Sequence, residues 1–317
     1  MPALIALDWG TSSLRGFLMD SMGTVLDTRS SKHGIQHLPE PGLAGYERAF
    51  ATLCGDWLAA HPGLPVVAGG MVGSAQGWVE APYVRCPADT DTLAAAAARV
   101  QTTLGPVIHI APGVLLDPED AAPDVMRGEE IQIAGALGAG IDAAQPACVI
   151  LPGTHSKWLR LEEGRIVDFA SYMTGEIFAV MRQHSILGRL MPETSDASDS
   201  DAAAAFTLGL TAARRAGPGD LTHLLFTTRS LGLTGRLAPG VLADYLSGLL
   251  IGQEIRSGGA RMIGTASPQI AMIGDPALCS RYLTAMAHMG LPAPMMLNNT
   301  APRGLFRFAQ ALGLLPH

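Results

Sequence analysis

Residues 3–20 read ALIALDWGTSSLRGFLMD, and this stretch decides how the chain begins to fold. The apolar run over residues 3–7 predicts a buried strand that ends at Asp8, and residues 14–20 predict a second strand after a polar turn. Gly10 lets the backbone turn tightly and lie close to a ligand. Hydroxyl and backbone N–H groups, which together suit phosphate oxygens, come from the next residues. These residues are Thr11, Ser12 and Ser13.

The same arrangement recurs in residues 147–168, which read ACVILPGTHSKWLRLEEGRIVD. Each copy has a strand, a polar loop that starts with glycine, a second strand, a glycine turn and a third strand with an aspartate. The equivalent residues are Gly10 and Gly153 in the loops, Gly23 and Gly164 in the turns, and Asp27 and Asp168 in the third strands. Two unrelated hairpins with similar turns would also give this pattern, but we favour a duplicated domain.

Between these copies the pattern predicts both helices and strands, the strands at residues 65–70 and 107–114. We expect helices over residues 45–60 and 90–103, and another that begins near Gly128. Residues 111–127 are rich in proline and read as a loop. From residue 175 onward the pattern is helical, with one late strand at residues 269–273 and an exposed acidic loop at residues 193–201.

Composition narrows the class of protein. The 317 residues suffice for two domains, and 48% hydrophobic against 15% charged residues argues for buried cores rather than disorder. The net charge of −7, without any cluster of Lys and Arg, argues against a nucleic-acid partner. The four cysteines form no CxxC pair, so we expect reduced thiols and no zinc site.

The sequence also predicts a soluble, cytoplasmic protein. The first residues lack the basic segment of a signal peptide, and Asp8 interrupts the apolar run. Since no apolar stretch approaches eighteen residues, we expect no membrane contact. The oligomeric state stays open, a homo-oligomer included.

Two glycine-led loops suit a triphosphate, because phosphoryl transfer depends on positioning and on neutralising charge. A carboxylate beside phosphates needs a cation between them, so Asp8 is a candidate partner of Mg²⁺ and its bound water. It is also a candidate catalytic base. The second loop offers a further set of donors, namely Gly153, Thr154, His155, Ser156 and Lys157. Lys157 would add a cation or point to solvent, and His155 would be a phosphate donor or only a turn residue.

The polar residues that follow Gly70 suit a sugar site, because they combine hydrogen-bonding groups with an aromatic plane. They are Ser74, Gln76, Trp78 and Glu80. Trp78 is equally well explained as a packing residue. Arg15 and Arg85 are candidates to bind a substrate carboxylate in a bidentate manner.

Five motifs in order resemble the 2-dehydro-3-deoxygalactonokinases, which are sugar-acid kinases of the actin-like ATPase superfamily. The motifs are DWGTSSLRGF (8–17), GMVGSAQGWVEAPYVRCPA (70–88), MRGEEIQIAGAL (126–137), LPGTHSKW (151–158) and ASYMTGEIFAVMRQHSILGRLM (170–191). The resemblance runs from Leu4 to about Leu314. It implies an α/β fold with two ribonuclease-H-like domains around a central cleft, and MgATP-dependent phosphorylation of the 6-hydroxyl of 2-dehydro-3-deoxy-D-galactonate in galactonate catabolism.

The resemblance also implies roles for particular parts of the chain. Residues 1–128 would hold the first phosphate loop and the sugar-acid site, and residues 129–317 the second phosphate loop and the adenosine site. Gly274, after the late strand, would lie against the adenosine, and Glu176 would close the substrate pocket. Related carbohydrate kinases place their base after a glycine at a helix N-terminus, a position that favours an ionised carboxylate. Glu129 and Glu130 both fit, with a slight preference for Glu129.

Three other interpretations compete with this one. A carbohydrate kinase of the same fold with another sugar or sugar acid is the nearest. An ATP-binding regulatory protein that transfers no phosphoryl group belongs to another class, and would not need Glu129 and Glu130. A dinucleotide oxidoreductase is disfavoured, because hydroxyl residues and a second strand follow Gly10 where a GxGxxG helix would be expected.

Overall fold

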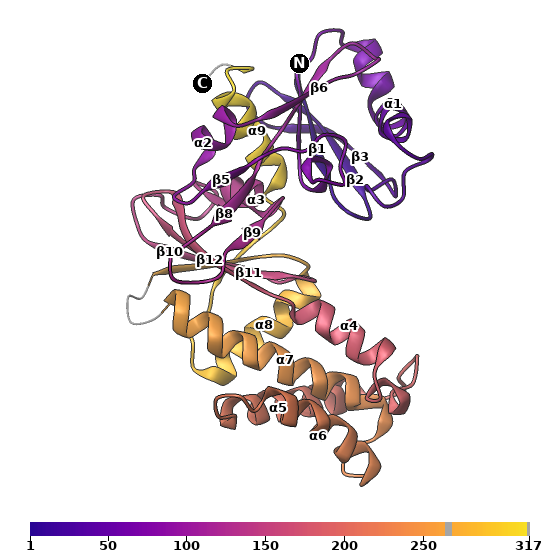
Figure 1. Ribbon diagram of the computed structural model, residues 1–317, viewed down its shortest axis with the longest axis vertical. Helices are drawn as coiled ribbons and strands as arrows, with labels where there is room; N and C mark the ends of the chain where they lie inside the picture. Colours follow the sequence, from indigo (N-terminus) through magenta and orange to yellow (C-terminus); the bar gives the residue numbers. More distant parts are fainter. Residues whose placement is uncertain (264–267, 316–317) are drawn as a thin grey trace. The chain divides into compact units, whose positions relative to one another are not determined.

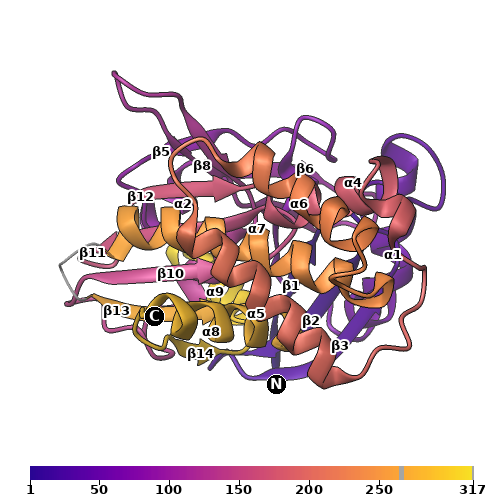
Figure 2. The ribbon, with the colours of Figure 1, turned by 90° about the horizontal axis from the view of Figure 1, so that it is seen from below.

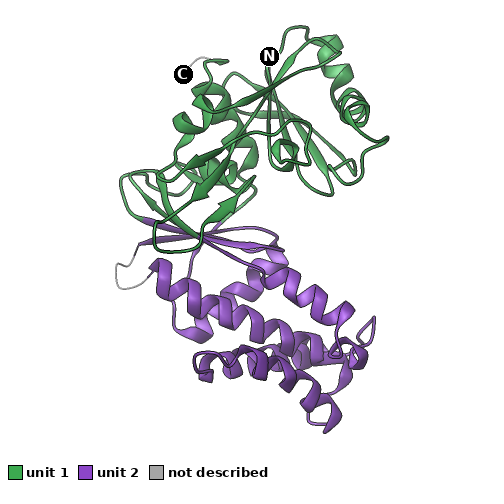
Figure 3. Cartoon of the chain, in the orientation of Figure 1, with its two compact units in different colours: residues 1–146, 160–169, 297–317 green, residues 147–159, 170–296 purple. Residues whose placement is uncertain are grey.

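The computed structural model describes residues 1–263 and 268–315, and the chain divides into two compact units (Figure 3). Unit 1 contains residues 1–146, 160–169 and 297–317, and unit 2 contains residues 147–159 and 170–296. The boundary expected after residue 128 differs from this division, because the segment after residue 128 and the last helix pack within unit 1. The predicted cleft between two domains stays a prediction.

Unit 1 is built on a six-stranded sheet in the order β3-β2-β1-β4-β7-β6. Figure 1 labels β1, β2 and β3, which are neighbours in it. Strand β1 pairs antiparallel with β2 and parallel with β4, and β4 pairs parallel with β7. The strands of this sheet are β1 (Pro2–Trp9), β2 (Leu14–Asp20), β3 (Val25–Ser31), β4 (Val66–Gly69), β6 (Ala98–Gln101) and β7 (Val107–Ile110). The helices of unit 1 are α1 (Leu43–Ala60), the 3-10 turn η1 (Met71–Gly73), α2 (Thr90–Ala95), α3 (Glu129–Ala136) and α9 (Ala301–Ala311).

The core of unit 1 explains why β1 is apolar throughout. Residues 4–7 are fully buried, because helices cover both faces of the sheet at this strand. Helix α1 contributes Tyr46, Phe50 and Trp57 to the core. Helices α3 and α9 cross in backbone contact, since a Cβ atom at Gly135 would lie 2.0 Å from the carbonyl oxygen of Thr300.

The second large sheet repeats the order of the first, β12-β11-β10-β13-β14. Its strands are β10 (Ala147–Leu151), β11 (Ser156–Glu162), β12 (Arg165–Tyr172), β13 (Gln269–Ile273) and β14 (Met295–Leu297). Strands β10 and β13 are parallel, as β1 and β4 are. A left-handed glycine follows the second strand of each sheet, Gly23 with φ 81° and Gly164 with φ 71°. The repeated order confirms the prediction of two ribonuclease-H-like folds.

The helices of unit 2 gather around α7, which contacts four other helices. Helices α5 and α7 lie side by side in both views (Figures 1 and 2). The elements are α4 (Thr174–His184), η2 (Gly188–Leu190), α5 (Asp199–Arg215), α6 (Leu221–Leu233), η3 (Pro239–Val241), α7 (Leu242–Gly258), the π-helical turn η4 (Gly259–Ile263) and α8 (Pro276–Met289). The described part of the chain contains no helix that is both long and apolar enough to cross a membrane.

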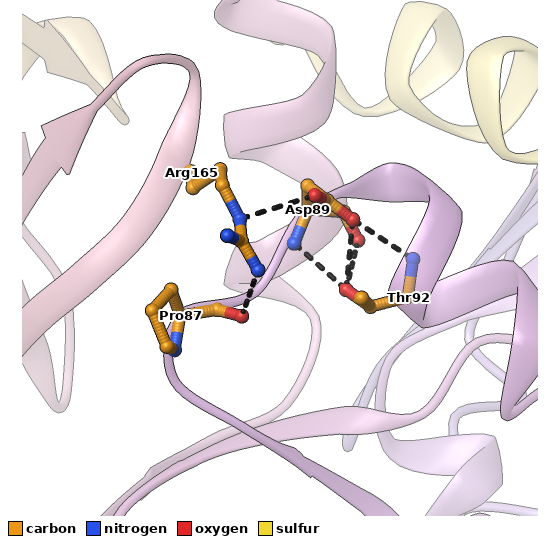
Figure 4. Close-up of polar contacts among 4 residues, drawn as sticks. All are labelled: Pro87, Asp89, Thr92 and Arg165. Carbon is orange, nitrogen blue, oxygen red and sulfur yellow. Dashed lines mark hydrogen bonds and ion pairs between the residues drawn. The ribbon is translucent and has the colours of Figure 1, made fainter.

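Polar contacts explain why residues 160–169 belong to unit 1 (Figure 4). Arg165 donates to the carbonyl oxygen of Pro87 at 2.9 Å and pairs with the Asp89 carboxylate at 3.2 Å. Asp89 also caps α2, because its side chain accepts from the backbone N–H of Thr92 at 2.8 Å. One carboxylate thus starts a helix and holds the tip of the β11–β12 hairpin.

Two predictions for residues 90–127 are wrong. The alanine-rich helix α2 ends at Ala95, and residues 98–101 form strand β6, which pairs with β7. Residues 111–127 contain β8 (Gly113–Leu116) and β9 (Asp124–Met126), which form a small sheet with β5 (Tyr83–Arg85). Pairing with strands distant in sequence overrides the local helix and loop preferences here.

Candidate functional site

The first predicted phosphate loop is a tight turn at the end of β1. The N–H of Gly10 donates to the carbonyl oxygen of Ser13 at 2.9 Å, which closes the turn. The loop is braced by residues 34–36, whose amides Ile35 and Gln36 donate to the carbonyl oxygens of Gly10 and Thr11 at 3.1 Å. Ser12 and Ser13 are exposed at its tip and Thr11 is half-buried.

Asp8 and Arg15 form an ion pair beside this loop. Asp8 is the last residue but one of β1, and Arg15 stands directly opposite on β2. The Arg15 Nη2 atom lies 2.9 Å from Asp8 Oδ2, and the Asp8 side chain is 23% exposed. Burial raises the pKa of the Asp8 carboxyl, and the Arg15 guanidinium opposes that shift. The predicted metal partner and the predicted carboxylate binder are therefore neighbours.

The start of α3, where the base is predicted, lies at the same edge of the sheet because Gly70 and Gly128 allow close backbone packing. In the parallel pairing of β1 with β4, Asp8 stands beside Gly69. The next residue, Gly70, packs so closely that a Cβ atom there would lie 2.8 Å from the carbonyl oxygen of Trp9. A Cβ atom on Gly128 would in turn lie 3.4 Å from the Gly70 Cα atom. The ends of β1, β4 and the start of α3 thus meet at one place.

Glu130 is fully enclosed at the start of α3. Its side chain is 1% exposed, and its Oε2 atom accepts from the Gly128 N–H at 2.6 Å. Its Oε1 atom has no hydrogen-bond partner among the described residues. Burial, with the Glu129 charge second, raises the pKa of Glu130 to about 8, against the opposing backbone N–H groups and Arg127. Burial thus favours the protonated form of Glu130 and encloses its carboxyl group in the protein.

Glu129 differs from its neighbour in exposure. It is only partly buried, and its Oε2 atom accepts from the Arg127 backbone N–H at 3.1 Å. The two acids thus have separate environments, as expected for adjacent helical residues. Of the pair, Glu129 is the carboxylate that a ligand can approach.

The segment after Gly70 mixes packing residues with exposed polar ones. Trp78 is 7% exposed, and its ring stacks on Tyr46 with centroids 5.6 Å apart. The structure therefore supports the packing interpretation of Trp78, and a role as a sugar-stacking plane lacks support. Gln76 and Glu80 are exposed, whereas the Ser74 hydroxyl is buried without a hydrogen-bond partner among the described residues.

Arg85 lies on β5 of the small sheet rather than beside Asp8. Its guanidinium pairs with Asp117 at 2.6 Å and is largely exposed. Sequence reasoning gave no role to Arg127, which lies next to the predicted base. The Arg127 Nη2 atom donates to the carbonyl oxygen of Ala81 at 2.8 Å, so the guanidinium anchors the end of the segment after Gly70.

The second predicted phosphate loop follows β10 in unit 2. Thr154 and His155 are exposed, and Gly153 is half-buried. Ser156 and Lys157 are buried, at 0% and 5% exposure, because they begin strand β11. The Lys157 side chain, predicted as a donor of this loop, is therefore buried rather than directed to solvent.

The N-terminus of α4 packs directly on this loop. A Cβ atom on Gly175 would lie 2.6 Å from the Gly153 carbonyl oxygen, so only glycine allows this approach. The Glu176 N–H donates to the carbonyl oxygen of Thr154 at 3.0 Å, and the Glu176 carboxylate pairs with the His155 ring. Glu176, predicted to contact the substrate, is therefore a partner of the loop.

A cavity of about 660 Å³ opens beside the second loop, entirely within unit 2. The loop and α4 contribute Gly153, Thr154 and Gly175 to its wall, and α7 and α8 contribute both apolar residues and the ion pair of Asp244 with Arg281. A volume of this size suits a nucleoside. Gly274 does not line the cavity, but its successor Asp275 does, and a Cβ atom on Gly274 would lie 3.3 Å from the Pro152 carbonyl oxygen.

The geometry thus contains two glycine-led loops on equivalent strands and acids beside the first of them. The family model for 2-keto-3-deoxy-galactonokinase matches residues 8–308. The chain belongs to the 2-keto-3-deoxy-galactonokinase family. It is therefore a member of a family of carbohydrate kinases, as the sequence motifs predicted.

Individual members of the 2-keto-3-deoxy-galactonokinase family are similar to the chain over almost its whole length. A candidate 2-dehydro-3-deoxygalactonokinase of Rhizobium meliloti is 36% identical and covers 97% of this chain and 96% of the relative. The 2-dehydro-3-deoxygalactonokinase of Escherichia coli is 33% identical, with 94% of each chain covered. A crystal structure of a candidate 2-dehydro-3-deoxygalactonokinase from Sinorhizobium meliloti superposes with a TM-score of 0.82 at 34% identity, covering 98% of this chain and 99% of the other.

Proposed function

We propose that this protein transfers the γ-phosphoryl group of ATP to the 6-hydroxyl of 2-dehydro-3-deoxy-D-galactonate, in the cytoplasm, as a step of galactonate catabolism. The observation that carries the proposal is the family match over residues 8–308, joined to the two glycine-led loops on equivalent strands. The names of the Rhizobium and Escherichia relatives supply the substrate.

The nucleotide is proposed to lie in the cavity of unit 2. Its adenosine would occupy the apolar part between α7 and α8, and its phosphates would face Gly153 and Thr154 at the cavity wall. Backbone N–H groups and hydroxyls of such loops bind phosphate oxygens. The first loop, from Gly10 to Ser13, is proposed to bind phosphate oxygens in the same way.

The residues near the first loop fit Mg²⁺ that is held mainly by phosphates and water. No cluster of three or more metal-ligating side chains occurs among residues 1–263 and 268–315. One partly exposed carboxylate, Asp8, lies at the strand end beside the loop. Mg²⁺ keeps several waters and commonly uses one or two carboxylates with substrate phosphates, so this donor set suits it. When bound, the ion would neutralise charge on the phosphates.

Glu129 is proposed as the group that accepts the proton of the sugar hydroxyl. It is partly exposed, and it stands at the start of α3, where the helix dipole favours the charged carboxylate. Glu130 is buried and holds its proton, so it lacks both the access and the charge that a base needs. Arg15 would face the substrate from its place beside Asp8.

The proposal is tested by incubating the protein with MgATP and a panel of 2-keto-3-deoxy sugar acids, then identifying products by mass spectrometry. We expect a product 80 Da heavier than 2-dehydro-3-deoxy-D-galactonate, the mass of one added phosphoryl group (roughly HPO₃), with fragments that place it on the 6-position. If only another sugar acid is phosphorylated, that compound is the substrate and our assignment is wrong. Nucleotide binding without any product would favour a regulatory protein.

A further inference from the structure

The carboxyl group of Glu254 on α7 is the centre of a buried hydrogen-bond network in unit 2. Glu254 is 2% exposed, and both of its oxygens accept hydrogen bonds. The Trp158 Nε1–H donates to Oε1 at 2.9 Å, and the Tyr282 hydroxyl donates to Oε2 at 2.7 Å. Thr174 adds a further side-chain hydrogen bond. Burial of a carboxyl group is costly, and these donors offset the cost only when they are all held in place around it.

The donors come from three different elements that surround the second loop. Trp158 lies on β11 just after the loop, Thr174 begins α4, and Tyr282 lies on α8. Together with α7, which carries Glu254, four elements of unit 2 meet at one carboxyl group. Helices α7 and α8 are adjacent in the ribbon (Figure 1).

The network continues from Glu254 into the loop itself. The Tyr282 and Ser156 hydroxyl oxygens are 2.9 Å apart. Tyr282 gives its only hydroxyl proton to Glu254, so its oxygen is an acceptor toward Ser156. Ser156 also has a side-chain hydrogen bond to Glu254. The Ser156 Oγ atom lies 3.4 Å from both the backbone nitrogen and the carbonyl oxygen of Gly153. A continuous chain of hydrogen bonds thus runs from Glu254 through Tyr282 and Ser156 to the glycine that starts the loop.

The residues held by Glu254 also form the wall of the cavity, although Glu254 does not. Thr174 and Tyr282 line the cavity, as do Gly153 and Thr154 of the loop. Glu254 therefore acts on a ligand in this cavity only through other residues.

We propose that Glu254 is a positioning residue for the nucleotide: its carboxyl group fixes the second loop and the start of α4 in the geometry that receives the phosphates. This inference rests on the proposed function, since it takes the cavity of unit 2 to be the ATP site. It predicts an effect on nucleotide affinity and none on binding of the sugar acid, whose predicted site lies in unit 1. No motif near the loop reveals it, because Glu254 follows Trp158 by 96 residues.

Two variants test the proposal. Glu254→Gln keeps the shape but puts an amide, which donates, where two donors need acceptors. Tyr282→Phe keeps the ring and removes the hydroxyl that links Glu254 to Ser156. Tyr245→Phe is the matched control, because Tyr245 is also buried in unit 2, at 3% exposure, and its hydroxyl contacts Thr227, which is not part of the loop.

For each protein, the measurements are the melting temperature, the Kd for the non-hydrolysable analogue AMPPNP with Mg²⁺ by calorimetry, and KM and kcat for both substrates. We expect Glu254→Gln and Tyr282→Phe to raise the Kd and the KM for the nucleotide roughly tenfold, which corresponds to about 1.4 kcal/mol. The KM for the sugar acid should stay within about twofold of the wild type. Tyr245→Phe should lower the melting temperature without changing the Kd.

Equal nucleotide affinity in wild type, Tyr282→Phe and Tyr245→Phe, with similar losses of stability, would show that the network is merely structural and would overturn the proposal. If Glu254→Gln fails to fold, Tyr282→Phe decides alone. If the wild type phosphorylates a sugar acid and both variants keep its nucleotide Kd and KM, only the positioning role of Glu254 is refuted. A wild-type protein that binds no nucleotide refutes the proposed function and this inference with it.

Discussion

Replacement of Glu130 by glutamine should stabilise the protein at neutral and alkaline pH. The folded chain holds the Glu130 carboxyl at 1% exposure with a pKa of about 8, whereas the ordinary value is 4.5. Between these two values the folded protein keeps a proton that the unfolded chain has lost. Stability therefore falls as pH rises through this window, because the unfolded state binds fewer protons.

The size of this effect follows from the pKa difference. Each pH unit between 4.5 and 8 lowers the free energy of unfolding by about 1.4 kcal/mol. At pH 7 the buried acid therefore lowers it by on the order of 3 kcal/mol. Glutamine has the shape of the protonated acid, and its carbonyl oxygen can still accept from the Gly128 N–H. Glutamine does not ionise, so the variant lacks this pH-dependent loss of stability. Its free energy of unfolding relative to wild type should therefore rise by about 3 kcal/mol between pH 5 and pH 8.

Thermal unfolding of wild type and Glu130→Gln from pH 5 to pH 8 measures this growth, which corresponds to roughly 6–12 °C in melting temperature. Glu119→Gln, at an exposed position of unit 1, controls for the loss of one charge. Melting curves of Glu130→Gln and wild type that shift in parallel with pH would refute the argument, since they would mean that Glu130 is ionised in the folded protein.

Four further outcomes are expected. Glu129→Gln should lower kcat about 10²–10⁴-fold and leave the nucleotide KM nearly unchanged, and a wild-type rate would remove Glu129 as the base. Asp8→Asn should lower kcat steeply at saturating Mg²⁺ while the melting temperature stays close to wild type; an unchanged rate would contradict its metal role. Thr11→Val and Thr154→Val should each cost about 1.5–3 kcal/mol in kcat/KM for ATP, and an effect of only one would separate the loops in function. Trp78→Ala should destabilise unit 1 by about 3–5 kcal/mol, as measured by chemical unfolding, and a stable variant with a raised sugar-acid KM would restore Trp78 to the substrate site.

The repeated strands could be predicted because their signals are local. The apolar run of residues 3–7 and the glycine turns at Gly23 and Gly164 specify strands and reversals without help from distant residues. The repeat of this strand–turn–strand pattern in residues 147–168 was enough to predict a second sheet like the first. The same reasoning failed for residues 98–101, where pairing with β7 determines the strand.

The candidate site was predictable only where it follows the loops. Gly10 and Gly153 start glycine-led loops that the sequence itself displays. Burial was not visible in the same way: Lys157 reads as a loop cation but begins a strand that is buried over its first four residues. Glu254 and Tyr282 reach the second loop only through the packing of α7 and α8, and no local pattern could reveal them.

Unit 1 begins with the first strand of the chain but needs one of the last helices to complete its core. Leu305 and Phe308 of α9 are fully buried, and Leu305 lies against the sheet near Gly69. During synthesis, the ribosome must therefore add the residues from 147 to 300 before α9 exists. At about 5–20 residues per second, this takes on the order of 10–30 s. Throughout that interval the nascent sheet lacks α9 on this apolar face and has only α3 to cover it, so unit 2 is able to finish folding before the unit that precedes it.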